Sequence, residues 1–206
     1  MKKTWIILGI LFLPLFFVQR SNAEVYTSIS GKVIAEDTGQ GISGVGIVAY
    51  KVEGKRGDEW RTETNEKGIY VIKNLKPGEY LIFLGKEDSP YIFEEKPMEV
   101  VLPIGKNVVN ANYILKRGGS VSGTVYDADG IAPLSRVWVS ASVQNPQPEW
   151  VSGFRAKLTD SNGRFLLQGL PESDSCIMEV SVQGHASLTK TVKITKGKIT
   201  ENVNFV

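Results

Sequence analysis

A seven-residue pattern that occurs twice constrains the fold of this chain more than any other feature. Residues 64–70 read Thr-Asn-Glu-Lys-Gly-Ile-Tyr, and residues 159–165 read Thr-Asp-Ser-Asn-Gly-Arg-Phe. In each copy a glycine that can adopt positive φ closes a polar turn, and an aromatic residue then starts an alternation of apolar and polar residues. The pattern predicts the tip of a β-hairpin in both places.

Other segments repeat at nearly the same distance. Residues 28–33 match residues 120–125, and residues 45–49 match residues 137–141, both at an offset of 92. A repeat of about ninety residues indicates two similar domains in tandem, because the units of solenoid proteins are far shorter. Each unit contains seven short alternating runs separated by turn residues. The sequence therefore predicts an all-β protein of two tandem seven-stranded β-sandwiches.

The expected domains are residues 24–116 and 120–206, joined by the short hinge Lys116-Arg117-Gly118-Gly119. Strands of the first domain are expected near residues 28–35, 44–51, 59–64, 69–74, 79–85, 97–102 and 108–115. In the second domain, alternation directs Val137 and Val139 into the core and Trp138 outward. An outward tryptophan is costly to leave in water, so we expect a loop, the first domain or a partner to cover it.

The first 23 residues have the three-part layout of a secretory signal peptide. Lys2 and Lys3 precede an apolar run from Trp5 to Val18, and Ser21 and Ala23 stand at the −3 and −1 positions of a cleavage site. The alternative is a retained membrane anchor, but spanning a bilayer takes roughly 20 apolar residues. We therefore expect cleavage after Ala23 and a secreted or periplasmic protein.

Charge and cysteine content exclude several classes of function. The chain has 24 Lys and Arg against 22 Asp and Glu. Without the expected signal peptide, which holds Lys2, Lys3, Arg20 and no acidic residue, the balance becomes 21 against 22. A nearly neutral protein lacks the basic surface that nucleic acid or an anionic membrane requires. The single cysteine, Cys176, excludes an internal disulfide, and its phase with Met178 and Val180 predicts a buried side chain.

Several motifs together resemble the carboxypeptidase regulatory-like domain family. They are Ser-x-Ser-Gly-x-Val at 28–33 and 120–125, the Val-x-x-x-Ala runs at 45–49 and 137–141, Thr-Asp-x-x-Gly-x-Phe at 159–165 and Gly-Leu-Pro at 169–171. The resemblance covers nearly the whole of both copies. It implies a transthyretin-like, immunoglobulin-like β-sandwich of the kind used as an accessory module in secreted and periplasmic proteins. The second copy departs from the pattern at residues 172–176. Such motifs specify the fold and its turns rather than a chemistry.

No catalytic, cofactor or metal site is expected. His185 is the only histidine and follows Gly184 at a loop tip, which favours a surface contact over catalysis. A zinc site would need three or four His or Cys ligands, and the chain has two such residues in total. The acidic turns at 127–130 and 160–163 faintly resemble calcium loops, but neither has the distal bidentate glutamate. Ordinary turns are therefore the favoured interpretation.

What remains as a source of function is the surface. Aromatic side chains on a β-sandwich can anchor a protein interface or stack against sugars. The candidate partner-binding residues are Trp138, Trp150, Trp60, Tyr91 and His185. We expect a non-catalytic secreted accessory protein that presents β-sandwich surfaces for structural or adhesive protein interaction at the cell envelope. The alternative is a carbohydrate-binding module that uses exposed aromatics. The expected partner is a protein or a glycan, with no nucleic acid and no membrane contact after signal cleavage.

Overall fold

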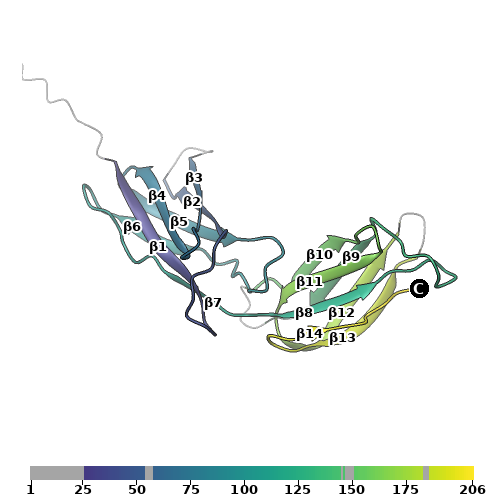
Figure 1. The fold of residues 1–206 in the computed structure, drawn as a ribbon. Coiled ribbons are helices and arrows are strands. Elements are labelled where there is room, and N and C mark those ends of the chain that lie inside the picture. Colours follow the sequence, from purple (N-terminus) through teal and green to yellow (C-terminus); the bar gives the residue numbers. More distant parts are fainter. Residues whose placement is uncertain (1–25, 54–57, 145, 147–150, 183–185) are drawn as a thin grey trace, which may run out of the picture.

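The computed structural model describes residues 26–206, except residues 54–57, 145, 147–150 and 183–185 (Figure 1). The expected signal peptide lies outside the described residues. No helix occurs in the part of the chain that is described, and none of it forms a helix long and apolar enough to cross a membrane. The chain forms two all-β sandwiches, as the alternation predicted.

The strands of the first sandwich are β1 (Thr27–Ala35), β2 (Gly46–Lys51), β3 (Glu59–Glu63), β4 (Ile69–Leu75), β5 (Gly78–Gly85), β6 (Met98–Leu102) and β7 (Tyr113–Leu115). Those of the second are β8 (Gly119–Thr124), β9 (Trp138–Val143), β10 (Phe154–Leu158), β11 (Arg164–Leu170), β12 (Ser173–Ser181), β13 (Leu188–Ile194) and β14 (Ile199–Thr200).

Both sandwiches have one topology. The first pairs a three-stranded sheet of order β4-β1-β7 with a four-stranded sheet of order β3-β2-β5-β6. The second repeats this with the orders β11-β8-β14 and β10-β9-β12-β13. In each sandwich the first and last strands pair in parallel, while every other strand pair is antiparallel.

The repeat extends to the backbone conformation of single residues. Positive φ recurs at equivalent positions of the two copies, as in Gly68 and Gly163 (73° and 68°) and in Asn110 and Asn202 (65° and 60°). Asn110 interrupts the last strand of the first copy, so the run expected at residues 108–115 is a strand only at its end. The amides of Val108 and Ala111 nevertheless donate to carbonyls of β1.

The predicted hairpin at residues 64–70 is wrong, and so is its equivalent at residues 159–165. β3 pairs with β2 and β4 pairs with β1, so this turn carries the chain from one sheet to the other. The turn chemistry itself is as expected. The Asn65 side-chain oxygen accepts from the amides of Lys67 and Ile69, and Gly68 has positive φ. A local turn pattern does not say which strands it joins.

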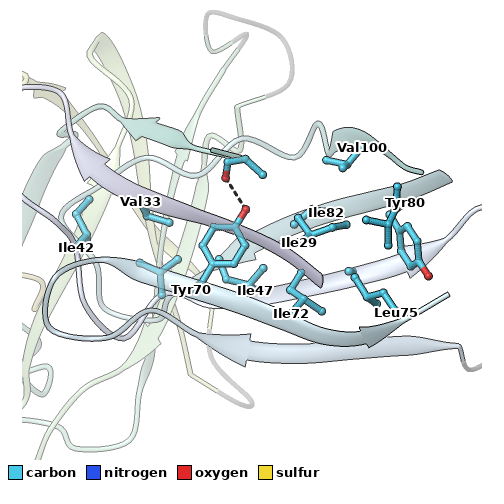
Figure 2. Close-up of a cluster of buried hydrophobic side chains, with 14 of the residues drawn as sticks. Ile29, Val33, Ile42, Ile47, Tyr70, Ile72, Leu75, Tyr80, Ile82 and Val100 are labelled. Atoms are coloured by element: carbon cyan, nitrogen blue, oxygen red, sulfur yellow. Dashed lines mark hydrogen bonds between the residues drawn. The ribbon is translucent and has the colours of Figure 1, made fainter. Parts of the chain in front are cut away.

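Each sandwich encloses its own core, and the predicted inward residues build it. Val45, Ile47 and Ala49 are buried in the first, as are Val137, Val139 and Ala141 in the second. At the centre of the first core, the Tyr70 hydroxyl donates to the carbonyl oxygen of Ala111 at 2.5 Å (Figure 2). Burial raises the pKa of this hydroxyl, so Tyr70 remains a donor at any physiological pH.

The two sandwiches contact each other directly. Gly119 begins β8, so the expected hinge is reduced to residues 116–118. The segment 86–97, which connects β5 to β6, lies against the second sandwich near β10 and β11 (Figure 1). Within this segment the Ile92 amide donates to the carbonyl of Lys116, and the Pro90 carbonyl accepts from the amide of Gly118.

Candidate functional site

A cleft of about 470 Å³ lies where the first sandwich meets the second. The segment after β5 forms one wall with Asp88, Tyr91 and Phe93 among its residues. The opposite wall comes from β9, β10 and β11 of the second sandwich and includes Trp138, Lys157 and Leu158. Neither sandwich alone contains the site.

Trp138 stands at the beginning of β9 and points away from the core, as predicted. The reason is local, because its neighbours Val137 and Val139 occupy the inward positions of the alternating run. The side chain is 56% exposed even though it lines the cleft. The expected cover is therefore incomplete, and a large aromatic surface remains in contact with water.

The outer face of the β10-β9-β12 layer continues from Trp138 with small and apolar side chains on β9 and β10, while the exposed Glu179 of β12 lies opposite Ser140. The register pairs Leu158 with Trp138 at one end of the face and Phe154 with Ser142 at the other. Phe154 is as exposed as Trp138. The two aromatic positions are four residues apart along β9, or ~13 Å. Ser140 lies between them on β9, Ser142 lies beside Phe154, and both serines are partly exposed.

Lys157 and Arg155, two of the basic residues that line the cleft, have partners within the protein. The Lys157 ammonium lies 2.7 Å from the Asp88 carboxylate across the two sandwiches. The Arg155 guanidinium donates to the carbonyls of Phe154 and Gly169 at 2.7 and 2.9 Å. Burial lowers the pKa of Arg155, and Glu95 partly opposes this shift. The Lys157–Asp88 pair links the two walls, whereas the Arg155 hydrogen bonds lie within the second sandwich.

Tyr91 belongs to the junction between the sandwiches rather than to a freely displayed surface. Its hydroxyl accepts from Arg117 at 3.2 Å, and the Arg117 guanidinium lies 5.1 Å from the centre of its ring. Arg117 also donates to the Asp37 carboxylate at 2.7 Å, and this hydrogen bond is the main reason that the pKa of Asp37 is lowered. Tyr91 is only partly exposed as a result.

Of the remaining candidates, Trp60 does not line the cleft. Trp60 is on edge strand β3 and packs against the first core, with its ring 5.6 Å from that of Tyr80 in a T-shaped arrangement. Trp150 and His185 lie outside the described residues. Of the three candidates within the described residues, the structure brings together Trp138 and Tyr91.

Two site residues were missed from the sequence. Phe154 could have been found, because the alternation of β10 puts it on the same face as Ala156 and Leu158. Phe93 could not, since it lies outside any strand and reaches the cleft only because the two sandwiches are in contact.

The residues considered for chemistry have structural roles. Cys176 is buried in the second core, and burial raises the pKa of its thiol. The Asp127 carboxylate accepts from the amides of Ile131 and Ala132, as expected for an ordinary turn. Among the described residues, no three His, Cys, Asp or Glu side chains gather in a way that could hold a metal ion.

Comparison with protein families assigns the two sandwiches separately. Residues 120–206 match the model of the carboxypeptidase regulatory-like domain. This match spans nearly the whole of the second sandwich. Residues 27–116 match a different model, the second β-sandwich domain of the BOS complex subunit NOMO1-like proteins. The two sandwiches in tandem thus match the models of two different β-sandwich domains. A comparison with curated protein sequences gave no match.

Solved structures with similar strand arrangements include three bacterial proteins. The Streptococcal ancillary pilin is 15% identical with a TM-score of 0.45, and the match covers 88% of this chain and 63% of that one. The Bacillus anthracis TIE protein is 16% identical with a TM-score of 0.41, covering 86% and 33%. The minor pilin GBS52 of Streptococcus agalactiae is 16% identical with a TM-score of 0.39, covering 86% and 94%. At these values the likeness concerns the fold alone.

Proposed function

We propose that this chain is an exported, non-catalytic protein of the cell envelope whose paired sandwiches make a structural or adhesive contact with another protein. The observation that carries the proposal is Trp138, which is more than half exposed at the mouth of a cleft built by both sandwiches. Aromatic residues of this kind are common anchors of protein interfaces. The structural roles of Cys176 and Asp127 also favour a binding function over catalysis.

Export is proposed from the N-terminal sequence. Residues 1–23 would be removed, and the mature domains would be residues 24–116 and 120–206. Mass spectrometry of the protein recovered from the periplasm or culture medium should then find Glu24 at the N-terminus. Recovery of Met1 in the membrane fraction would contradict the proposal.

The proposed protein contact can be tested at Trp138 in producing cells. A photo-crosslinking phenylalanine analogue in place of Trp138 should give a discrete adduct with one envelope protein. The matched control places the analogue at Val101, which is 66% exposed on the outer face of the first sandwich. Equal adducts at both positions, or none at Trp138, would contradict a specific protein contact there.

A second candidate function is glycan binding, favoured by the outer face described above. Trp138 and Phe154 share this face with the partly exposed hydroxyl-bearing residues Ser140 and Ser142, and the Glu179 carboxylate of β12 lies opposite Ser140. Aromatic rings can stack against sugar rings, while hydroxyl groups can form hydrogen bonds with them.

The variant Trp138→Ala should abolish binding of the purified protein on a glycan array, and Val101→Ala should not. Because Trp138 is largely exposed, its removal should lower the free energy of unfolding by only about 1 kcal/mol. A loss of roughly 3 kcal/mol or more would instead identify Trp138 as a packing residue. Unchanged glycan binding by a stable Trp138→Ala protein would exclude this role.

A further inference from the structure

We propose that the edge of the second sandwich between β10 and β11 is a docking site for a neighbouring sandwich, and that Gly169 determines its specificity. In this chain the segment 86–97 of the first sandwich occupies the site. The docked segment makes the two sandwiches one rigid body. This inference concerns contacts within the chain and does not depend on the function proposed above.

The contact at Gly169 leaves no room for a side chain. A Cβ atom at this position would lie 2.6 Å from the carbonyl oxygen of Tyr91 and 2.7 Å from that of Ser89. Separations this short do not occur for real Cβ atoms, and both opposing atoms belong to the backbone. Ser89 itself is buried. Any residue other than glycine would therefore displace the first sandwich.

The equivalent position of the first copy shows that backbone conformation alone does not require this glycine. Asn74 lies 95 residues earlier, and its φ of 60° is close to the 69° of Gly169. Asparagine tolerates this left-handed conformation better than most residues. The first copy therefore has the same backbone conformation with an asparagine side chain. The second copy has glycine, which leaves space for the backbone of the first sandwich.

Backbone contacts on both sides of Gly169 hold the docked segment. The Gly118 amide donates to the Pro90 carbonyl at 2.8 Å, and a Cβ at Gly118 would lie 2.7 Å from the carbonyl carbon of Gly169. Further along, Glu94 forms an antiparallel bridge with Val151. Three chain segments thus meet at one point without intervening side chains, which fixes their positions closely.

Ion pairs surround this point but add little to it. Lys157 pairs with Asp88, and Lys196 pairs with Glu36 at 3.1 Å. All four side chains are substantially exposed, and exposed pairs contribute little net stability. The pairs favour one orientation of approach, while the close backbone contact at Gly169 supplies the specificity.

The first sandwich is not built to receive a neighbour in the same way. Its corresponding edge has Asn74 in place of Gly169, and Trp60 in place of Arg155, which donates to the Gly169 carbonyl. The Trp60 ring instead packs on the first core, in a T-shaped contact with the ring of Tyr80. Docking is therefore directional, from the segment after β5 of the first sandwich to the edge of the second.

Exchange of the two equivalent residues tests the proposal in the full chain. Gly169→Asn keeps a residue that accepts positive φ but adds a side chain at the contact, whereas Asn74→Gly is the matched control. We expect Gly169→Asn to give separate rotational correlation times for the two sandwiches in ¹⁵N relaxation and a larger maximum dimension in small-angle scattering. The wild type and Asn74→Gly should each show a single correlation time and the same compact dimension.

A single correlation time with an unchanged dimension for Gly169→Asn would overturn the proposal. If that variant does not fold, hydrogen exchange of the wild type decides instead. The amides of Ile92 and Gly118 should exchange as slowly as those of the strands, because their acceptors belong to the docked junction. Exchange at the rate of open loops would overturn the proposal as well.

Discussion

Thr64 and Thr159 illustrate how a single hydroxyl organises each sandwich at the residue scale. The Thr64 hydroxyl donates to the Ile42 carbonyl and accepts from the Val45 amide. Thr159 makes the equivalent pair of bonds with Leu134 and Val137. Both are buried, so each satisfies two backbone groups that would otherwise be costly to bury. The repeated motif begins with threonine for this reason.

The next residue of the motif is Asn65 in the first copy and Asp160 in the second. This exchange predicts that the two sandwiches lose stability differently as the pH falls. The Asp160 carboxylate accepts from the amides of Arg164 and Asn162, and these bonds lower its pKa from the ordinary value of an aspartate. A carboxyl group whose pKa is lower in the folded than in the unfolded protein stabilises the fold fully at pH values above its unfolded-state pKa. This stabilisation is lost as the pH falls through its folded-state pKa. Asn65, the equivalent residue, makes similar bonds without titrating.

Asp160→Asn should therefore weaken the acid sensitivity of the second sandwich. The measurement is the melting temperature of both proteins between pH 5 and pH 2 in steps of half a unit. The two curves should have different slopes below about pH 4, where free aspartates titrate. Parallel curves across the whole range would mean that the carboxylate contributes nothing to folding.

At the scale of single elements, the turn between β10 and β11 requires glycine at residue 163 for two reasons, backbone conformation and lack of space. Gly163 has a φ of 68°, and a Cβ there would lie 2.7 Å from the Val125 carbonyl oxygen. Gly130, in the same sandwich, has a φ of 71°, but the nearest atom to its Cβ would be a Val206 methyl at 3.6 Å. The first glycine is required by both conformation and space, and the second by conformation alone.

Alanine substitution should separate these two effects. Gly130→Ala should cost about 1–2 kcal/mol, which is the typical strain of a left-handed non-glycine residue. Gly163→Ala should cost clearly more, because the new methyl group also collides with the backbone. Urea unfolding followed by fluorescence measures both values. Equal losses would show that the space around Gly163 relaxes freely.

Much of each element could be predicted from the sequence because the relevant signals are local. Alternation correctly placed Val139 inward and Trp138 outward, and the turn motif correctly required positive φ at Gly163. The pairing of β3 with β2 rather than β4 could not be predicted in this way. A hairpin and a crossover between sheets use the same turn residues, and only long-range packing decides between them.

At the scale of the whole molecule, the junction is the part that the sequence did not reveal. Tyr91 and Phe93 lie between strands, with no periodicity to indicate a buried contact. Their role depends on Gly169 and Arg117, which are distant in sequence. A repeat alignment nevertheless contains one relevant signal, because the two copies differ at Asn74 and Gly169. The exchange of asparagine for glycine can be interpreted only when the contact between Gly169 and the first sandwich is known.

High salt should leave the arrangement of the two sandwiches unchanged. The pairs Lys157–Asp88 and Lys196–Glu36 are exposed, and at 1 M salt the screening length is about 3 Å. The backbone contacts at Gly118 and Gly169 are short-range and are not screened. Small-angle scattering at 0.1 M and 1 M sodium chloride should give superimposable curves. Expansion at high salt would show that the ion pairs, rather than the backbone contact, hold the junction.

The parallel pairing of the first and last strands determines how each sandwich would respond to mechanical load. In the first, Val33 to Ala35 pair with Tyr113 to Leu115, and in the second, Ser120 and Val121 pair with Ile199 and Thr200. The chain enters at one end of such a pair and leaves at the other. A pull on the two ends therefore shears the interstrand hydrogen bonds together instead of opening them one by one. A tether under tension would gain resistance from this geometry without any disulfide.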